Sequence, residues 1–126
     1  MFRQGAYRVD DKRKEVLIMK LMTKEIEKKF EKFPLYSQDG KGQEAEVVVK
    51  FFGGSAATWL ITEGEKQENG DWLFFGYCTL GFEWEWGEVM LSQLESVKFP
   101  PFGLGVERDL HCKGMKVKDL VKGWDE

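Results

Sequence analysis

Four residues near the C-terminus carry the side chains that acid–base chemistry or metal binding requires: Glu107, Arg108, Asp109 and His111. If this segment is extended, Glu107, Asp109 and His111 share one face and Arg108 lies on the other. Two carboxylates and an imidazole on one face could transfer protons in a small hydrolase or bind its metal ion. We favour a structural role, in which Arg108 pairs with carboxylates and fixes the preceding loop, because structural ion pairs are commoner than sites.

A second acidic group lies in the centre of the chain, where Glu83 and Glu85 alternate with aromatic residues. Together with Glu63 and Glu88 they could supply the paired carboxylates that glycoside hydrolysis needs. In an extended strand, however, the alternation places the two glutamates on the face opposite the aromatic rings. We therefore expect Glu83 and Glu85 to face solvent, where a binding partner can reach them. The aromatic residues of this alternation are Phe82, Trp84 and Trp86.

The other polar residues exclude several kinds of site. His111 is the single histidine, so Ser-His or Cys-His catalysis would have to use it. Cys78 and Cys112 lack Cys-x-x-Cys spacing, and Cys78 lies in an apolar segment that is typical of a core. The double glycine at 53–54 is not followed by the Gly-Lys-Ser/Thr of a phosphate-binding loop. We therefore assign no catalytic residue and expect neither a metal ion nor a cofactor.

The composition is that of one globular domain. Of the 126 residues, 42% are hydrophobic and 33% are charged, which allows a real core and excludes a disordered chain. No apolar run is long enough to cross a membrane, and the charged N-terminus lacks the apolar region of a signal peptide. With cysteines that form no evident disulfide pattern, we expect a cytoplasmic protein that does not bind membranes.

The net charge of −3 hides an uneven distribution. Residues 1–33 carry ten Lys or Arg against six Asp or Glu, whereas residues 34–96 carry three against eleven. The aromatic centre is therefore acidic, and it is a poor surface for the phosphates of a nucleic acid. A basic protein partner suits it better. Weak nucleic-acid binding through the basic N-terminal helix is an alternative, and the sequence specifies no small-molecule ligand.

The first 18 residues show no sustained periodicity, and we expect either a disordered arm or a misassigned start. Met19 opens a segment that is a natural beginning for a small cytoplasmic protein. Residues 14–16, Lys-Glu-Val, are what a purine-rich ribosome-binding site would encode if it were translated in frame. They lie a short spacer upstream of Met19. If the source is bacterial, we expect translation to begin at Met19, and codons at 14–16 that do not spell such a site would remove this expectation. The remaining residues, 19–126, are predicted to form a single domain.

The expected elements place the candidate residues in a sheet. Thr23 is a predicted N-cap, and Lys24 to Lys32 form a helix with Ile26, Phe30 and Phe33 on one apolar stripe. Extended segments are predicted at 45–52, 58–63 and 72–80, the last covered on both faces, and at 82–91 with a bulge at Gly87. A Ser-x-x-Glu capping box is expected to open a short helix at 92–95, and 117–121 to form a final helical turn. The fold class is α+β: an antiparallel sheet of about four strands in meander order, packed against the N-terminal helix, with a short second helix after the last strand.

Several segments also follow one another in the order seen in a small bacterial family. The chain resembles the domain of unknown function 2958 over roughly residues 19–121, most specifically in the Glu-Arg-Asp-Leu segment after the Gly-Leu-Gly loop. Members tend to be encoded on plasmids, phages and conjugative elements, sometimes near or fused to antirestriction-type proteins, and membership implies no activity. Where the family often has an acidic-leucine-glycine segment, this chain has the aromatic segment 82–87. The matching segments are 21–26, 35–37, 58–63, 74–77, 91–97 and 105–111.

The resemblance and the residues together favour a non-enzymatic protein-interaction module, or an accessory factor of a mobile genetic element, that binds through the acidic aromatic face. The alternative is a small hydrolase or metal-dependent enzyme built on Glu107, Asp109 and His111. Exposure of Trp84 and Trp86 favours the first, and a pocket converging on Asp109 and His111 favours the second.

Overall fold

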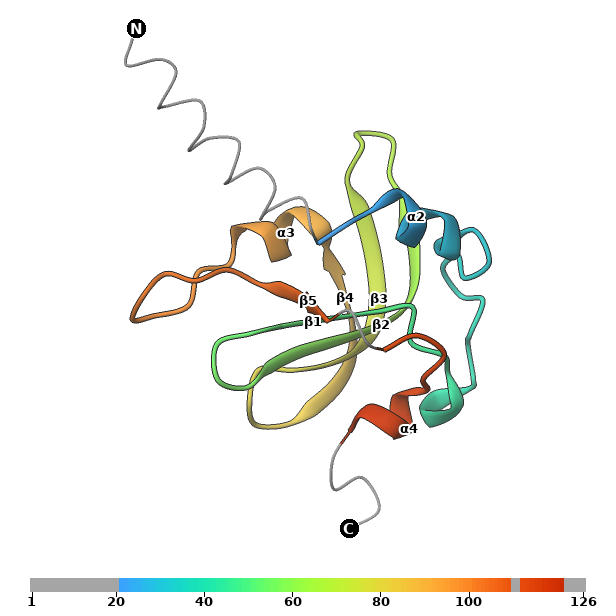
Figure 1. Ribbon diagram of the computed structural model, residues 1–126. Helices are drawn as coiled ribbons and strands as arrows, with labels where there is room; N and C mark the ends of the chain where they lie inside the picture. The colour runs from blue at the N-terminus through green and yellow to red at the C-terminus, as the bar shows by residue number, and fades with distance from the viewer. Residues whose placement is uncertain (1–20, 110–111, 122–126) are drawn as a thin grey trace, which may run out of the picture.

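The computed structural model describes residues 21–109 and 112–121, and His111 lies outside them, as do residues 1–20 and 122–126. Over these described ranges the fold is α+β, with a five-stranded sheet and three short helices (Figure 1). None of the helices in the described part of the chain is long and apolar enough to cross a membrane. In chain order the elements are α2 (Lys24–Phe30), the 3-10 turn η1 (Gly42–Glu44), β1 (Val49–Gly53), β2 (Ala57–Lys66), β3 (Trp72–Thr79), β4 (Trp84–Met90), α3 (Leu91–Ser96), β5 (Glu107–Asp109) and α4 (Val117–Leu120).

The strands are antiparallel and lie in the order β4-β3-β2-β1-β5. The sequence predicts about four strands, and the structure has five, because the three-residue β5 returns from the C-terminal region to pair with β1. The order of the whole sheet is therefore not a simple meander. β4 and β5 form its two edges, so the two groups of candidate residues lie on opposite edges of one sheet.

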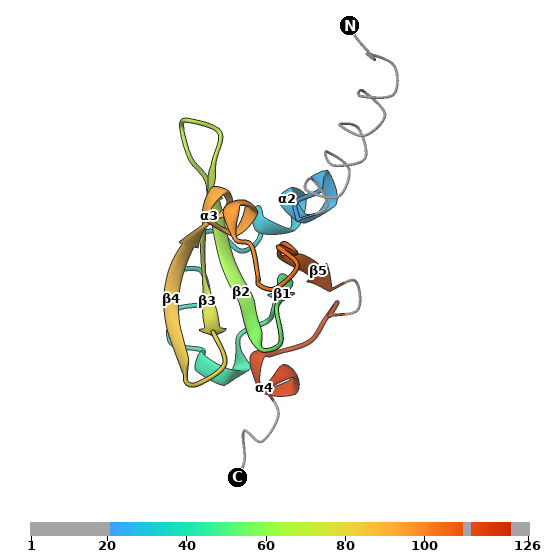
Figure 2. The ribbon, with the colours of Figure 1, turned by 90° about the vertical axis from the view of Figure 1, so that its left-hand side faces the viewer.

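The first face of the sheet carries the larger hydrophobic cluster, covered by α2 and α3 (Figure 2). Thr23 caps α2 as predicted, accepting a hydrogen bond from the backbone N–H of Ile26 at 3.1 Å. The stripe on this helix brings Phe30 onto the sheet, where its ring lies 5.5 Å from that of Trp72 and 5.4 Å from that of Phe74. Burial of this stripe holds α2 in place, because a seven-residue helix is marginal on its own.

The opposite face carries a smaller cluster around Leu60, covered by α4 and by the segment that leads into β1 (Figure 1). Ala45 and Val47 belong to this segment and are buried, but the strand itself begins only at Val49, four residues later than the predicted start. Two lysines fasten α4 to η1, since Lys116 and Lys118 donate to Glu44 at 3.0 and 2.9 Å. These hydrogen bonds lower the pKa of Glu44, and the bond from Lys118 has the larger effect. The buried members of the cluster are Ala45, Val47, Leu60, Cys112, Val117 and Val121.

The predicted bulge at Gly87 is wrong. The β3–β4 pairing runs without interruption from Leu73–Met90 to Thr79–Trp84, and Gly87 lies directly opposite Gly76. The irregularity of the sheet is in β2 instead, between Ile61 and Glu63. The parity change that suggested a bulge has another cause: Val89 points to the buried face with Phe74, while the helix begins immediately afterwards at Leu91.

The start of α3 also differs from its prediction. The N-cap is Met90, whose backbone N–H donates to the side chain of Gln93 at 2.8 Å, and Ser92 lies inside the helix. The Ser92 hydroxyl donates instead to Asp71 at 2.6 Å, and this hydrogen bond is the main cause of the lowered pKa of Asp71. Asp71 also accepts from the backbone N–H of Trp72 at 2.8 Å, so it ties α3 to the first residue of β3.

Candidate functional site

Of the candidate residues near the C-terminus, the structure describes Glu107, Arg108 and Asp109, which form the edge strand β5. In β5, Asp109 lies opposite Lys50 of β1, and their side chains form an ion pair at 3.6 Å with about a quarter of each exposed. Glu107 is exposed, and Arg108 is half-buried on the face of Phe51. The cation next to the Asp109 carboxylate is thus Lys50 of β1, whereas the sequence suggested Arg108 for this structural role. Within the described residues, no group of three or more histidines, cysteines and acids is placed to bind a metal ion.

The β3–β4 hairpin, residues 72–90, contains the other candidates. Glu85 lies opposite Cys78, and Glu88 lies opposite Phe75. Directly paired residues point to the same face of an antiparallel sheet, so Glu85 and Glu88 lie on different faces of β4. Glu83, Glu85 and Glu88 are all exposed, as the alternation predicts for the first two.

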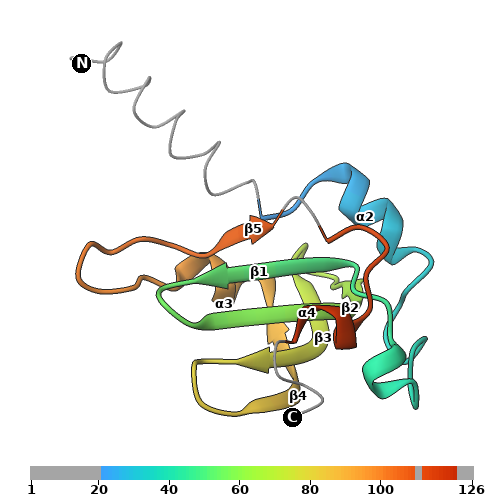
Figure 3. The same ribbon diagram turned by 60° about the horizontal axis from the view of Figure 1, so that its bottom comes forward.

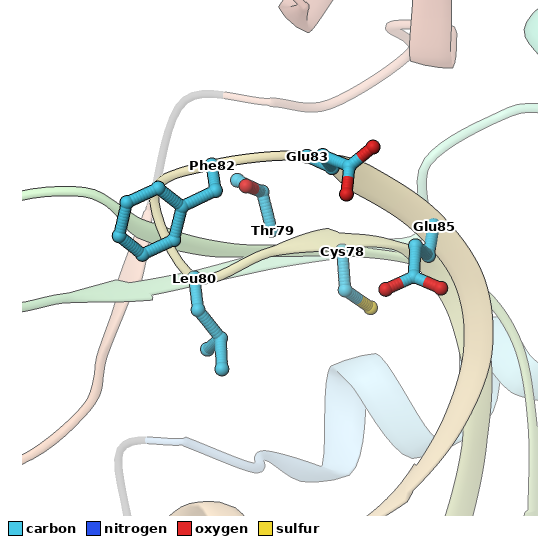
Figure 4. Close-up of a pocket in the computed structure, with 6 residues that line it drawn as sticks. All are labelled: Cys78, Thr79, Leu80, Phe82, Glu83 and Glu85. Atoms are coloured by element: carbon cyan, nitrogen blue, oxygen red, sulfur yellow. The ribbon is translucent and has the colours of Figure 1, made fainter.

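The tip of this hairpin encloses a shallow depression of about 290 Å³ (Figure 4). Leu80 and Phe82 contribute apolar walls and remain 71% and 94% exposed. Glu85 lies directly opposite Cys78 across the hairpin, and both side chains line the depression. The depression therefore combines large apolar side chains with carboxylates, and it lies across the sheet from Asp109. It is lined by Cys78, Thr79, Leu80, Phe82, Glu83 and Glu85.

Burial makes the Cys78 thiol a poor nucleophile in this depression. Burial raises the pKa of this thiol to about 12 from an ordinary value of 9.0. The thiolate, which is the reactive form, is therefore about a thousandfold scarcer at pH 8 than for an unperturbed thiol. We expect iodoacetamide to alkylate Cys78 about a thousandfold more slowly in the folded protein than in the urea-unfolded chain, as measured by peptide mass spectrometry. Equal rates in the two states would show that the thiol is accessible and ionised.

A row of stacked aromatic rings crosses the same hairpin on the other face. Tyr77 lies 5.1 Å from Trp84 and 4.8 Å from Trp86, and Phe75 stacks on Trp86 at 5.6 Å with planes 13° apart. Trp84 is half-buried because it packs against the smaller cluster, whereas Trp86 is 39% exposed. Of the two tryptophans singled out from the sequence, Trp86 is the one that a partner can reach.

At the end of the sheet that holds the hairpin tip, the β1–β2 turn lies between this tip and the loop that follows α3 (Figure 3). Gly53 and Gly54, in the β1–β2 turn, lie against the ring of Phe99, and Gly81 lies against Ala56 of that turn. The loop after α3 also exposes large apolar side chains. The residues concerned are Phe102 and Leu104.

The sequence alone did not reveal that one acidic side chain is buried. Glu63 is 2% exposed, and its two carboxylate oxygens accept hydrogen bonds from the backbone N–H groups of Tyr36 at 2.6 Å and Gln38 at 2.9 Å. Gln38 is itself buried and bonds to the backbone of Glu46 and Thr62. Every buried polar side-chain atom of the described residues has a partner, so this network fixes the loop at residues 36–38.

Comparison with known proteins places the chain in a family. Residues 21–118 match the family described as "Protein of unknown function (DUF2958)". No curated protein and no solved structure gives a significant match. The matched range contains the whole sheet and the helices α2 and α3, and it agrees with the resemblance seen in the sequence. The chain belongs to the DUF2958 family.

Proposed function

We propose that the protein is a non-enzymatic protein-interaction module whose β3–β4 hairpin docks a basic protein partner. The observation that carries this proposal is the charge of the hairpin region. Residues 67–97 contain no lysine or arginine and six acidic residues, although the whole chain has a net charge of only −3. Surfaces of soluble proteins usually mix the two signs of charge, so a segment of one sign favours a partner of the opposite sign.

The geometry of the hairpin supports docking in two further ways. β4 is an edge strand, and of the described strands it pairs with β3 alone, which leaves backbone groups along its outer side for an extended segment of another protein. Leu80 and Phe82 add exposed apolar area at one end of that edge. Large exposed apolar side chains beside charges are typical of protein interfaces.

The family resemblance suggests where such a partner is encoded. Because similar proteins tend to be encoded on plasmids, phages and conjugative elements, we place this protein in the cytoplasm as an accessory factor of such an element. Its partner is then a basic protein of the element or of the host. Nothing in the geometry of Glu107 and Asp109 favours an enzyme over this role, because Asp109 is paired with Lys50.

The test compares two variants of equal net charge. The hairpin variant combines Glu83→Gln, Glu85→Gln and Glu88→Gln, and the control combines Glu25→Gln, Glu31→Gln and Asp39→Asn, which are also exposed. A partner captured from the native host by the tagged full chain is identified, purified and titrated calorimetrically. Three exposed charges at about 0.5 kcal/mol each should weaken binding about tenfold in the hairpin variant. The control should bind like the wild type.

Equal weakening by both variants would show that binding depends only on overall charge. Unchanged binding by the hairpin variant would exclude the hairpin as the docking surface. Either result contradicts the proposal.

A further inference from the structure

We infer that Trp86 and Glu88 form a seat for one arginine side chain of the basic partner. This inference rests on the proposed function and specifies its chemistry. It concerns the face of the β3–β4 hairpin that carries the aromatic row, not the depression at the hairpin tip.

The two residues share one face of the edge strand. Trp86 lies opposite Tyr77, and Glu88 lies opposite Phe75, in an unbroken antiparallel register. Side chains two residues apart on a strand point the same way, with their Cα atoms roughly 7 Å apart. A flat group that covers the part of the Trp86 ring left open by Phe75 therefore lies on the same face of β4 as the Glu88 side chain.

The Trp86 ring is held in place for such a contact. It stacks on Phe75 at 5.6 Å with an interplanar angle of 13° and contacts Tyr77 at 4.8 Å. This packing fixes the orientation of the indole yet leaves 39% of the residue exposed. A ring that is already immobilised loses little further conformational entropy when a ligand covers it.

The charges around the ring favour a cation. Glu88 is exposed, and the exposed Glu65 lies on the same face, opposite Leu73 on β3. Neither β3 nor β4 carries a lysine or an arginine. The negative face of an indole attracts a cation within about 6 Å of the ring centroid, and tryptophan does so best.

Arginine fits this seat better than lysine. Its guanidinium is planar, so it can lie parallel to the indole while its edge donates two hydrogen bonds to one carboxylate. The lysine ammonium is a compact, strongly hydrated charge that cannot make both contacts in this way. The seat should therefore discriminate between two side chains of the same charge.

Three synthetic peptides of the form acetyl-Gly-Ser-X-Gly-X-Ser-Gly-amide, in which X is arginine, lysine or citrulline, test this inference with the full chain. The readout is the indole N–H signal of Trp86 and the backbone amide signal of Glu88 in nitrogen–proton correlation spectra, with the indole signal assigned from Trp86→Phe. We expect the arginine peptide to shift both signals saturably, the lysine peptide to bind at least about threefold more weakly, and the uncharged citrulline peptide to give no shift.

Glu88→Gln, which keeps the shape of the side chain, should weaken binding of the arginine peptide about threefold to tenfold. Glu95→Gln changes an exposed acid on α3 and should leave binding unchanged. Equal affinity for arginine and lysine, shifts confined to other residues, or no binding of any peptide would each overturn the arginine seat. The proposed docking function would survive these results if the partner still depended on Glu83, Glu85 and Glu88 together, so the two failures are distinguishable.

Discussion

Replacing Gly76 with alanine is expected to destabilise the protein by about 3 kcal/mol or more. A Cβ atom at this position would collide with the carbonyl oxygen of Leu60 and lie 2.8 Å from the Cα of Ile61. Both are backbone atoms of β2, which is held between β3 and β1 and cannot move aside. Glycine within a strand often marks such a close approach of two backbones. The measurement is the free energy of unfolding in urea, followed by tryptophan fluorescence.

The residue directly opposite supplies a matched control. Gly87 pairs with Gly76 across the β3–β4 ladder, and a Cβ atom there would meet nothing within 4 Å. Gly87→Ala should therefore change the free energy of unfolding by no more than about 0.5 kcal/mol. If the two variants were equally stable, the close approach of β2 to β3 would not exist in solution.

Replacing Glu63 with alanine is expected to cost about 3 kcal/mol, because two charge-assisted hydrogen bonds to backbone donors are lost in a buried site. The carboxylate holds the N–H groups of Tyr36 and Gln38, and Tyr36 has a φ of 73°, an uncommon value for a residue other than glycine. Without Glu63 these donors have no acceptor, so the segment after α2 should loosen. Urea unfolding measures the stability, and amide hydrogen exchange at Tyr36 and Gln38 reports the loosening.

Glu65 provides the comparison for this variant. It lies two residues further along β2 and is exposed, so Glu65→Ala should change stability by no more than about 0.5 kcal/mol. Glu63→Gln, which keeps one carbonyl acceptor, should fall between the two. A Glu63→Ala protein as stable as Glu65→Ala would show that the loop does not depend on the buried carboxylate.

Local patterns in the sequence predict the elements whose cause is local. Thr23 and the spacing of Ile26, Phe30 and Phe33 specify α2, because a cap and an apolar stripe act within one or two turns of helix. The strand around Phe74 is likewise recognisable, since both of its faces carry apolar residues. The family resemblance was also recognisable from sequence and is confirmed over residues 21–118.

Features that depend on distant contacts could not be derived in this way. β5 has only three residues and forms because it can pair with the edge of β1. No local sequence pattern predicts this pairing. Glu63 is buried because the segment at 36–38 folds over it. Its charge alone would suggest a residue exposed to solvent. Ser92 looked like a helix cap, but its hydroxyl has a better acceptor in Asp71, 21 residues earlier.

The candidate site was predictable in part. Alternation correctly indicated that Glu83 and Glu85 are exposed, but only the register of the hairpin shows that Glu88 and Trp86 share a face. For the segment at 107–109 the sequence left a short strand and a turn as alternatives, and the ion pair of Asp109 depends on Lys50, which lies more than 50 residues earlier in the chain. No contact in the structure tests the predicted roles of these residues in binding, so these roles stay predictions.

The two hydrophobic clusters lie on opposite faces of the same sheet and have no residue in common. The smaller one is closed by a four-residue helix, a short segment before β1 and two exposed lysine contacts to Glu44. Such a cover can detach while the larger cluster and the β3–β4 hairpin stay folded, because few buried contacts oppose its opening. We therefore expect the cover of the smaller cluster to open before the larger cluster unfolds, and the face of the sheet that carries Trp86 and Glu88 is the one on which this cover lies.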